Sequence, residues 1–141
     1  MRTETTPEQI ARYQADGFLH YPNFLEADEI AELRDSITAA IATMGKRKVA
    51  GDGANMEEGD EFYDRVFTQR LNLWRINDTV KSYIASPKLG QMISKLAGVE
   101  QFRIWHDQAL IKEPYANHTA LHTDNPFWSF HSDKAISIWI A

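Results

Sequence analysis

The sequence predicts an α+β fold, with helices in the first part of the chain and strands in the second. Two observations carry this prediction: apolar residues recur every three or four positions as far as Gly98, and beyond it they alternate with a period of two. Helices followed by strands are typical of folds in which helices are braced on a sheet or barrel. The 141 residues correspond to about one domain, so we expect residues 1–141 to form a single unit.

Composition and charge narrow the possible functions. Hydrophobic residues make up 43% and charged residues 25%, which excludes a disordered or low-complexity chain. The net charge of −5 argues against a nucleic-acid partner. The absence of cysteine excludes disulfides and cysteine-ligated metals. No apolar run reaches about 18 residues and no secretory signal is visible, so we expect no membrane association and a cytoplasmic location.

Two helices are predicted near the start of the chain. Thr6 caps the first, with Pro7 in its first turn, Gln9 completing a capping box and Gly17 ending it. The second helix carries apolar residues at spacings of three and four and ends at Gly45. These residues are Ile30, Leu33, Ile37, Ile41 and Met44.

Residues 45–61 change in character. Three basic residues are followed by glycines and acidic residues. Because glycine and like charges both resist packing, we expect a mobile surface loop. Two interpretations remain open, a solvated linker and a lid over a site.

Two further helices are predicted before Gly98. Asn77 or Asp78 caps the first, and Ser86 with Pro87 starts the second. Both carry apolar residues at helical spacing, and we expect those residues to pack in the core. They are Val80, Tyr83, Ile84, Leu89, Met92, Ile93 and Leu96.

Strands are predicted after Gly98. Residues 102–111 alternate as a long strand that ends before Pro114, and residues 135–141 form the last strand. Between them, residues 115–120 are expected to be a loop, and residues 121–124 a short extended piece broken by Asn125 and Pro126.

His122 and Asp124 are the candidate metal ligands. Residues i and i+2 of a strand share a face, with Cα atoms about 6.5–7 Å apart, so an imidazole and a carboxylate can converge on one metal ion. One further His would complete the 2-His-1-carboxylate triad of non-haem iron oxygenases. A histidine in a solvated loop is the alternative. A helical zinc pair of His118 with His122 is disfavoured by the flanking prolines.

Several segments together resemble the phytanoyl-CoA dioxygenase family. The family pattern includes a His-x-Asp pair followed closely by aromatic residues and then by a strand that carries a tryptophan. It also includes an earlier strand that ends at a proline, and a helical region before that strand. Each of these features has a counterpart here. These segments are residues 16–18, 23–25, 73–75, 86–89, 108–114, 121–128 and 135–141. They occur in the family's order over nearly the whole chain.

The resemblance implies an Fe(II)- and 2-oxoglutarate-dependent dioxygenase that uses O2 to hydroxylate its substrate. It implies a double-stranded β-helix, a cupin-like jelly roll on which the N-terminal helices pack. His122 and Asp124 would bind Fe(II). Gln108 and Trp139 would contact 2-oxoglutarate, with a sheet-edge amide and a core aromatic residue as the alternatives.

The same resemblance suggests a substrate pocket and bears on one related activity. Phe127 and Trp128 would wall the pocket, and ordinary core packing is the alternative. Asp124 favours hydroxylation over the halogenation of related enzymes, which replace this carboxylate with a small residue.

One departure from the family pattern is large. The pattern needs a distal His as third ligand and an Arg for the cosubstrate, both well downstream of Asp124, and only residues 125–141 follow it. We therefore expect an incomplete barrel whose open edges allow self-association, and little turnover by this chain alone. A truncated, non-catalytic binding or structural module is one alternative. A cupin-like metalloprotein that does not use 2-oxoglutarate is another.

Overall fold

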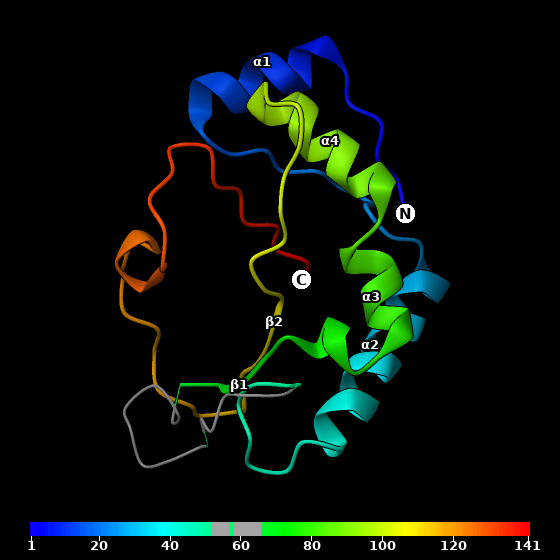
Figure 1. Cartoon of the computed structure of the whole chain (residues 1–141), viewed down its shortest axis with the longest axis vertical. Coiled ribbons are helices and arrows are strands. Elements are labelled where there is room, and N and C mark those ends of the chain that lie inside the picture. Colours follow the sequence, from blue (N-terminus) through cyan, green and yellow to red (C-terminus); the bar gives the residue numbers. More distant parts are fainter. Residues whose placement is uncertain (52–56, 58–65) are drawn as a thin grey trace.

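The computed structural model describes residues 1–51, 57 and 66–141. In order, the elements of these residues are α1 (Pro7–Asp16), α2 (Ala27–Ala42), β1 (Thr68–Leu71), the 3-10 helix η2 (Leu73–Arg75), α3 (Asp78–Ile84), α4 (Pro87–Ala97), β2 (Gln108–Ile111) and the 3-10 helix η3 (Asn125–Phe127). The α-helices lie along the top and right of the molecule in Figure 1. From β2 onward the chain runs through the centre and along the left.

The first helix begins and ends as its sequence predicts. The Thr6 hydroxyl accepts a hydrogen bond from the Gln9 N–H (3.2 Å), and the Gln9 side-chain oxygen accepts one from the Thr6 N–H (2.9 Å). Gly17 ends α1 in the left-handed conformation with φ of 78°, which glycine adopts without steric cost. The capping box confirms that local sequence specifies this helix.

The helices bury their apolar faces in two clusters. The larger one joins α2, η2 and α3 and contains Leu25, Leu33, Ala40, Met44, Ala50, Leu73, Val80 and Tyr83. The smaller one joins α4 to α1 and contains Leu89, Met92 and Leu96. These clusters confirm the predicted apolar faces, although Ile30 remains 37% exposed at the edge of α2.

The predicted caps of the later helices are confirmed in part. The Asn77 side chain accepts a hydrogen bond from the Val80 N–H (3.0 Å) at the start of α3. Ser86 precedes Pro87 at the start of α4 but makes no side-chain capping bond. Gly98 ends α4 with φ of 66°, as its sequence predicts.

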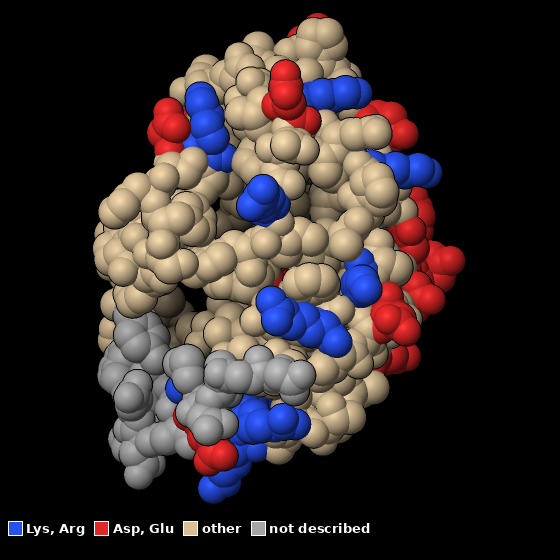
Figure 2. Space-filling model, viewed as in Figure 1, with Lys and Arg blue, Asp and Glu red and all other residues tan. Residues whose placement is uncertain are grey.

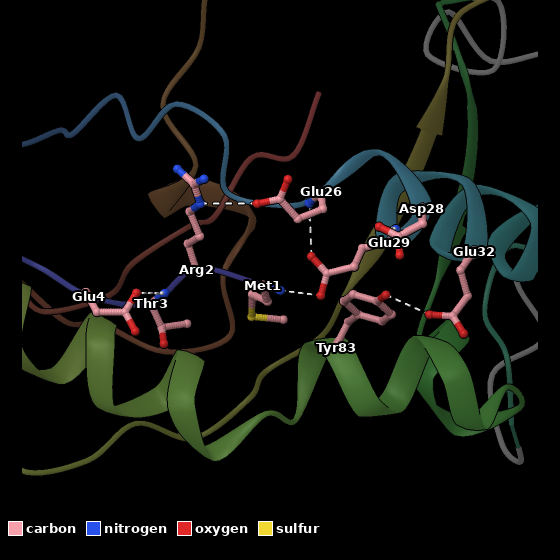
Figure 3. A network of polar contacts seen from close by, with 9 residues as sticks. All are labelled: Met1, Arg2, Thr3, Glu4, Glu26, Asp28, Glu29, Glu32 and Tyr83. Atoms are coloured by element: carbon pink, nitrogen blue, oxygen red, sulfur yellow. Dashed lines mark hydrogen bonds and ion pairs between the residues drawn. The ribbon is translucent and has the colours of Figure 1, made fainter.

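Polar contacts along α2 attach its neighbours to it (Figure 3). The amino group of Met1 forms an ion pair with Glu29, and the Tyr83 hydroxyl of α3 donates to the Glu32 carboxylate (2.7 Å). Burial, followed by the contact with Glu32, raises the pKa of Tyr83 to about 12. The hydroxyl of Tyr83 therefore stays a hydrogen-bond donor at neutral pH.

β1 and β2 pair as an antiparallel two-stranded sheet, in which Gln69 faces Leu110 and Leu71 faces Gln108. The sequence analysis did not predict β1. The Ala50 N–H donates to the Leu71 carbonyl (2.9 Å), which draws the chain before the sheet against β1.

That chain belongs to the predicted loop 45–61, of which residues 52–56 and 58–61 lie outside the described residues. Gly45, Lys46 and Arg47 are exposed, whereas Lys48 and Ala50 are buried, so the described start of the segment is packed only in part.

Two predicted strands differ from the structure. The strand expected over residues 102–111 forms only at Gln108–Ile111, where β1 runs beside it. The strand expected at residues 135–141 is not formed. A strand, unlike a helix, needs a neighbour for its backbone hydrogen bonds, and among the described residues no backbone hydrogen bond reaches 135–141. At this level of description the fold is α+β, with one small sheet.

Charge is distributed unevenly over the surface. Asp and Glu side chains gather along the right edge in Figure 2, whereas the middle of the left side shows only uncharged side chains. Within the described part of the chain, no helix combines the length and apolar character that crossing a membrane requires.

Candidate metal centre

His122 and Asp124 lie side by side, as their spacing predicts. The imidazole Nε2 of His122 is 3.5 Å from the Asp124 Oδ1. The other ring nitrogen, Nδ1, lies 2.8 Å from the Ala120 carbonyl. Because a carbonyl only accepts hydrogen bonds, Nδ1 is the donor in this contact. Nε2 is therefore the ring nitrogen that faces Asp124 and could bind a metal ion in the neutral form of the ring.

This separation is close to that of two ligands of one metal ion. Ligand atoms about 2.1 Å from a metal are about 3.0–3.4 Å apart at octahedral to tetrahedral angles. The observed 3.5 Å lies just outside this range. The Ala120 carbonyl also accepts from the imidazole, and a hydrogen bond of this kind commonly fixes the ring orientation of metal-binding histidines. The nitrogen and oxygen donors of this pair therefore fit a divalent metal such as Fe(II).

A turn, rather than the pleat of a strand, brings the two side chains together. Asp124 has helical backbone angles (φ −76°, ψ −28°) and precedes η3. Its carbonyl accepts a hydrogen bond from the Phe127 N–H (2.8 Å), which closes the turn. The expectation that residues 121–124 are extended is therefore wrong at Asp124, although the predicted proximity to His122 is found.

The pair is open to solvent. The side chain of His122 is 40% exposed and that of Asp124 is 54% exposed. In the described ranges, no third His, Asp or Glu joins them in a cluster that could hold a metal ion. The pair therefore offers two donor groups, and a metal site built on them would need at least one more.

The predicted pocket aromatics belong to two different groups. The Phe127 ring stands edge-on to the His122 ring at 6.0 Å, so it lies directly beside the candidate ligand. Trp128 instead stacks on Phe130, with ring centroids 5.2 Å apart, and Trp105 packs edge-on against both. Sequence reasoning missed Trp105 and Phe130, because only the folded chain brings these distant rings together.

The two candidate cosubstrate residues lie apart from the metal pair. Gln108 is exposed at the start of β2, where its side-chain oxygen accepts a hydrogen bond from the Gln69 Nε2 (2.9 Å). Trp139 is 80% exposed. Over residues 1–51 and 66–141, no hydrogen bond, ion pair or ring contact joins Gln108 or Trp139 to His122 or Asp124. Sequence reasoning missed Gln69 because it did not predict β1.

Asp107 has a structural role beside the site. Its carboxylate accepts hydrogen bonds from the N–H groups of Leu73 and Trp74, both at 3.2 Å, and so caps η2 from the residue before β2. Burial raises the pKa of Asp107 although these bonds oppose the shift. Burial lowers the pKa of neighbouring His106, and the charge of Asp107 opposes that shift.

Two cavities of about 280 Å³ lie elsewhere, beside Met1 and Lys88. Gln91 and Lys95 of α4 line one, and Glu29 and Tyr83 line the other. Neither is lined by His122 or Asp124, so these cavities are separate from the candidate metal centre.

Comparison with known proteins identifies the family. The model of the family described as phytanoyl-CoA dioxygenase (PhyH) matches residues 13–141. No curated protein and no solved structure matched the chain. The matched range includes the His122–Asp124 pair, the sheet and α2 to α4. The chain therefore belongs to the phytanoyl-CoA dioxygenase family.

Proposed function

We propose that the chain carries part of the active site of an Fe(II)- and 2-oxoglutarate-dependent dioxygenase that hydroxylates a small molecule. The observation that supports this most is the convergence of His122 Nε2 on the Asp124 carboxylate in a chain of this family. The contact of the His122 Nδ1 with the Ala120 carbonyl adds support, because it leaves Nε2 as the nitrogen that can bind a metal ion.

Each residue of the site has a proposed part. His122 and Asp124 hold Fe(II), and a further His completes the triad. Gln108 and Trp139 contact 2-oxoglutarate. When bound, Fe(II) supplies the redox chemistry that activates O2 with the cosubstrate. The chain's own part is to orient these groups, and Phe127, beside His122, excludes water on one side of the site.

The proposed fold of the catalytic unit is a double-stranded β-helix. The antiparallel pairing of β1 with β2 supports it, as does the alternating sequence of residues 135–141. In this proposal the helices brace one face of the barrel, and residues 135–141 become a strand when a neighbouring strand pairs with them.

Metal binding tests the site directly. We expect Mn(II), as a redox-inert substitute for Fe(II), to bind residues 1–141 weakly in calorimetry. His122→Ala or Asp124→Ala should weaken binding about 10-fold or more, since even the loss of a hydrogen-bond partner of a metal ligand lowers metal affinity about 10- to 100-fold. His131→Ala is the matched control, because this exposed histidine lies outside the pair. Equal binding by wild type and His122→Ala would contradict the assignment.

Turnover tests the chemistry. Succinate formed from 2-oxoglutarate is measured with Fe(II) and ascorbate for wild type, His122→Ala and His131→Ala. We expect low turnover by wild type that His122→Ala abolishes and His131→Ala preserves. If wild type binds no metal and forms no succinate, the non-catalytic binding module becomes the better account.

A further inference from the structure

The strand pair holds one polar contact that the proposed function does not use. Gln69 of β1 lies opposite Leu110, and Gln108 lies two residues from Leu110 on β2. Opposed residues share a face of the sheet, as do residues two apart, so both glutamines project from one face. Their side chains meet there, and the Gln69 Nε2 donates to the Gln108 Oε1 at 2.9 Å.

This hydrogen bond determines which end of the Gln108 amide remains free. A glutamine amide has an oxygen that only accepts and a nitrogen with two N–H donors. Gln69 occupies the oxygen, so the NH2 group of Gln108 is left available, and the Gln108 residue is exposed. A free NH2 suits a carboxylate, whereas a free amide oxygen would repel one.

We propose that Gln69 is a positioning residue that presents the NH2 group of Gln108 to a carboxylate of 2-oxoglutarate. This inference rests on the proposed function, in which Gln108 contacts that cosubstrate. An exposed glutamine alone samples several rotamers and both orientations of its amide. Here a partner on a paired strand selects one orientation before the ligand arrives, which lowers the ordering cost of binding.

Three substitutions at Gln69 test which of the two glutamines donates the hydrogen bond and which accepts it. A glutamate can only accept, so Gln69→Glu turns the NH2 of Gln108 toward β1. A lysine can only donate, so Gln69→Lys keeps that NH2 free, and Gln69→Ala removes the contact. Gln101→Ala is the matched control, because Gln101 is exposed and lies outside the sheet.

The measurement is the dissociation constant of 2-oxoglutarate, by calorimetry on the chain loaded with Mn(II). We expect Gln69→Ala to weaken binding about 3- to 10-fold and Gln69→Glu about 10- to 100-fold. Gln69→Lys and Gln101→Ala should stay within about 2-fold of wild type. Thermal unfolding of each variant checks that it is folded.

Repeating the Gln69 substitutions in a Gln108→Ala protein separates the effect of amide orientation from the effect of side-chain charge. On Gln108→Ala, the change to Ala at Gln69 should no longer matter, and any remaining effects of Gln69→Glu and Gln69→Lys measure the charges of these side chains alone. The side-chain amide signals of Gln108 in NMR spectra provide a readout without ligand, and we expect them to shift in Gln69→Glu but only slightly in Gln69→Lys.

The outcomes distinguish this inference from the proposed function. Equal affinities of Gln69→Glu and Gln69→Lys, or effects that persist undiminished on Gln108→Ala, would overturn the role of Gln69 alone. A Mn(II)-loaded wild type that binds no 2-oxoglutarate would overturn the proposed function, and this inference with it.

Discussion

The described residues of the helical part of the chain, residues 7–97, pack apolar side chains into a core, whereas residues 98–141 bury no hydrophobic side chain. Among the described residues every buried hydrophobic residue lies between Leu25 and Leu96. Most exposed large hydrophobic residues lie instead from Ile104 onward, with Tyr115 and Leu121 fully exposed. The second region nevertheless holds the candidate ligands His122 and Asp124.

The difference follows from how the two kinds of element satisfy their backbones. A helix forms its hydrogen bonds within itself and then needs only one apolar partner face. A strand depends on a neighbour, and β2 pairs along four residues only. Apolar residues of the second region therefore stay exposed, and local opening should be easiest there.

Truncating one leucine in each region tests this comparison, and the largest effect is expected in the helical region. Leu73 is completely buried, so Leu73→Ala should lower the free energy of unfolding by about 2–5 kcal/mol. Leu121 is fully exposed, and Leu121→Ala should change it by about 0.5 kcal/mol or less. Urea denaturation followed by circular dichroism measures both. A comparable loss from Leu121→Ala would show that the second region is packed in solution.

The next effect concerns the hydrogen bonds to Asp107, one of several contacts that join the two regions. Asp107→Ala removes the acceptor for the Leu73 and Trp74 N–H groups, so we expect a loss of about 1–3 kcal/mol in the free energy of unfolding. Asp107→Asn should cost less, because an amide oxygen still accepts a hydrogen bond and carries no buried charge. The same denaturation experiment ranks the two variants. A larger loss for Asn than for Ala would contradict the capping role.

The smallest effect lies wholly within the helical region and depends on pH. The pKa of Tyr83 is raised to about 12 in the fold from 10.0, so the contribution of its hydroxyl is fully present below pH 10. Between pH 10 and about 12 the unfolded chain loses this proton more readily than the folded one, and stability falls.

Tyr83→Phe should lose about 1 kcal/mol at neutral pH, because it lacks the bond to Glu32. The stability gap between wild type and this variant should narrow as pH rises through that window, since phenylalanine does not titrate. Thermal melts across pH 8–12 measure the gap. A gap that stays constant would show that the hydroxyl of Tyr83 titrates alike in both states.

Much of the helical region was predictable because its signals are local. Thr6 and Gln9 cap α1 within one turn, and Asn77 caps α3 in the same way. The proximity of His122 to Asp124 was predictable because only one residue separates them. β1, Gln69 and the capping role of Asp107 were not, because each depends on a partner more than 30 residues away in the chain.

The sequence by itself determined the positions of the helices, both ends of α1 and α4, the apolar faces they bury and the pair of candidate metal ligands. The second helix ends at Ala42, short of the expected Gly45. Those features depend on interactions within about one helical turn or one tight turn, whose partners can be read from adjacent positions. Only the tertiary structure decided where strands form, that a turn closes Asp124 toward His122, and that Gln69 engages the oxygen of the Gln108 amide. Strand pairing and side-chain contacts between distant segments depend on which segments meet, and that is a property of the whole fold.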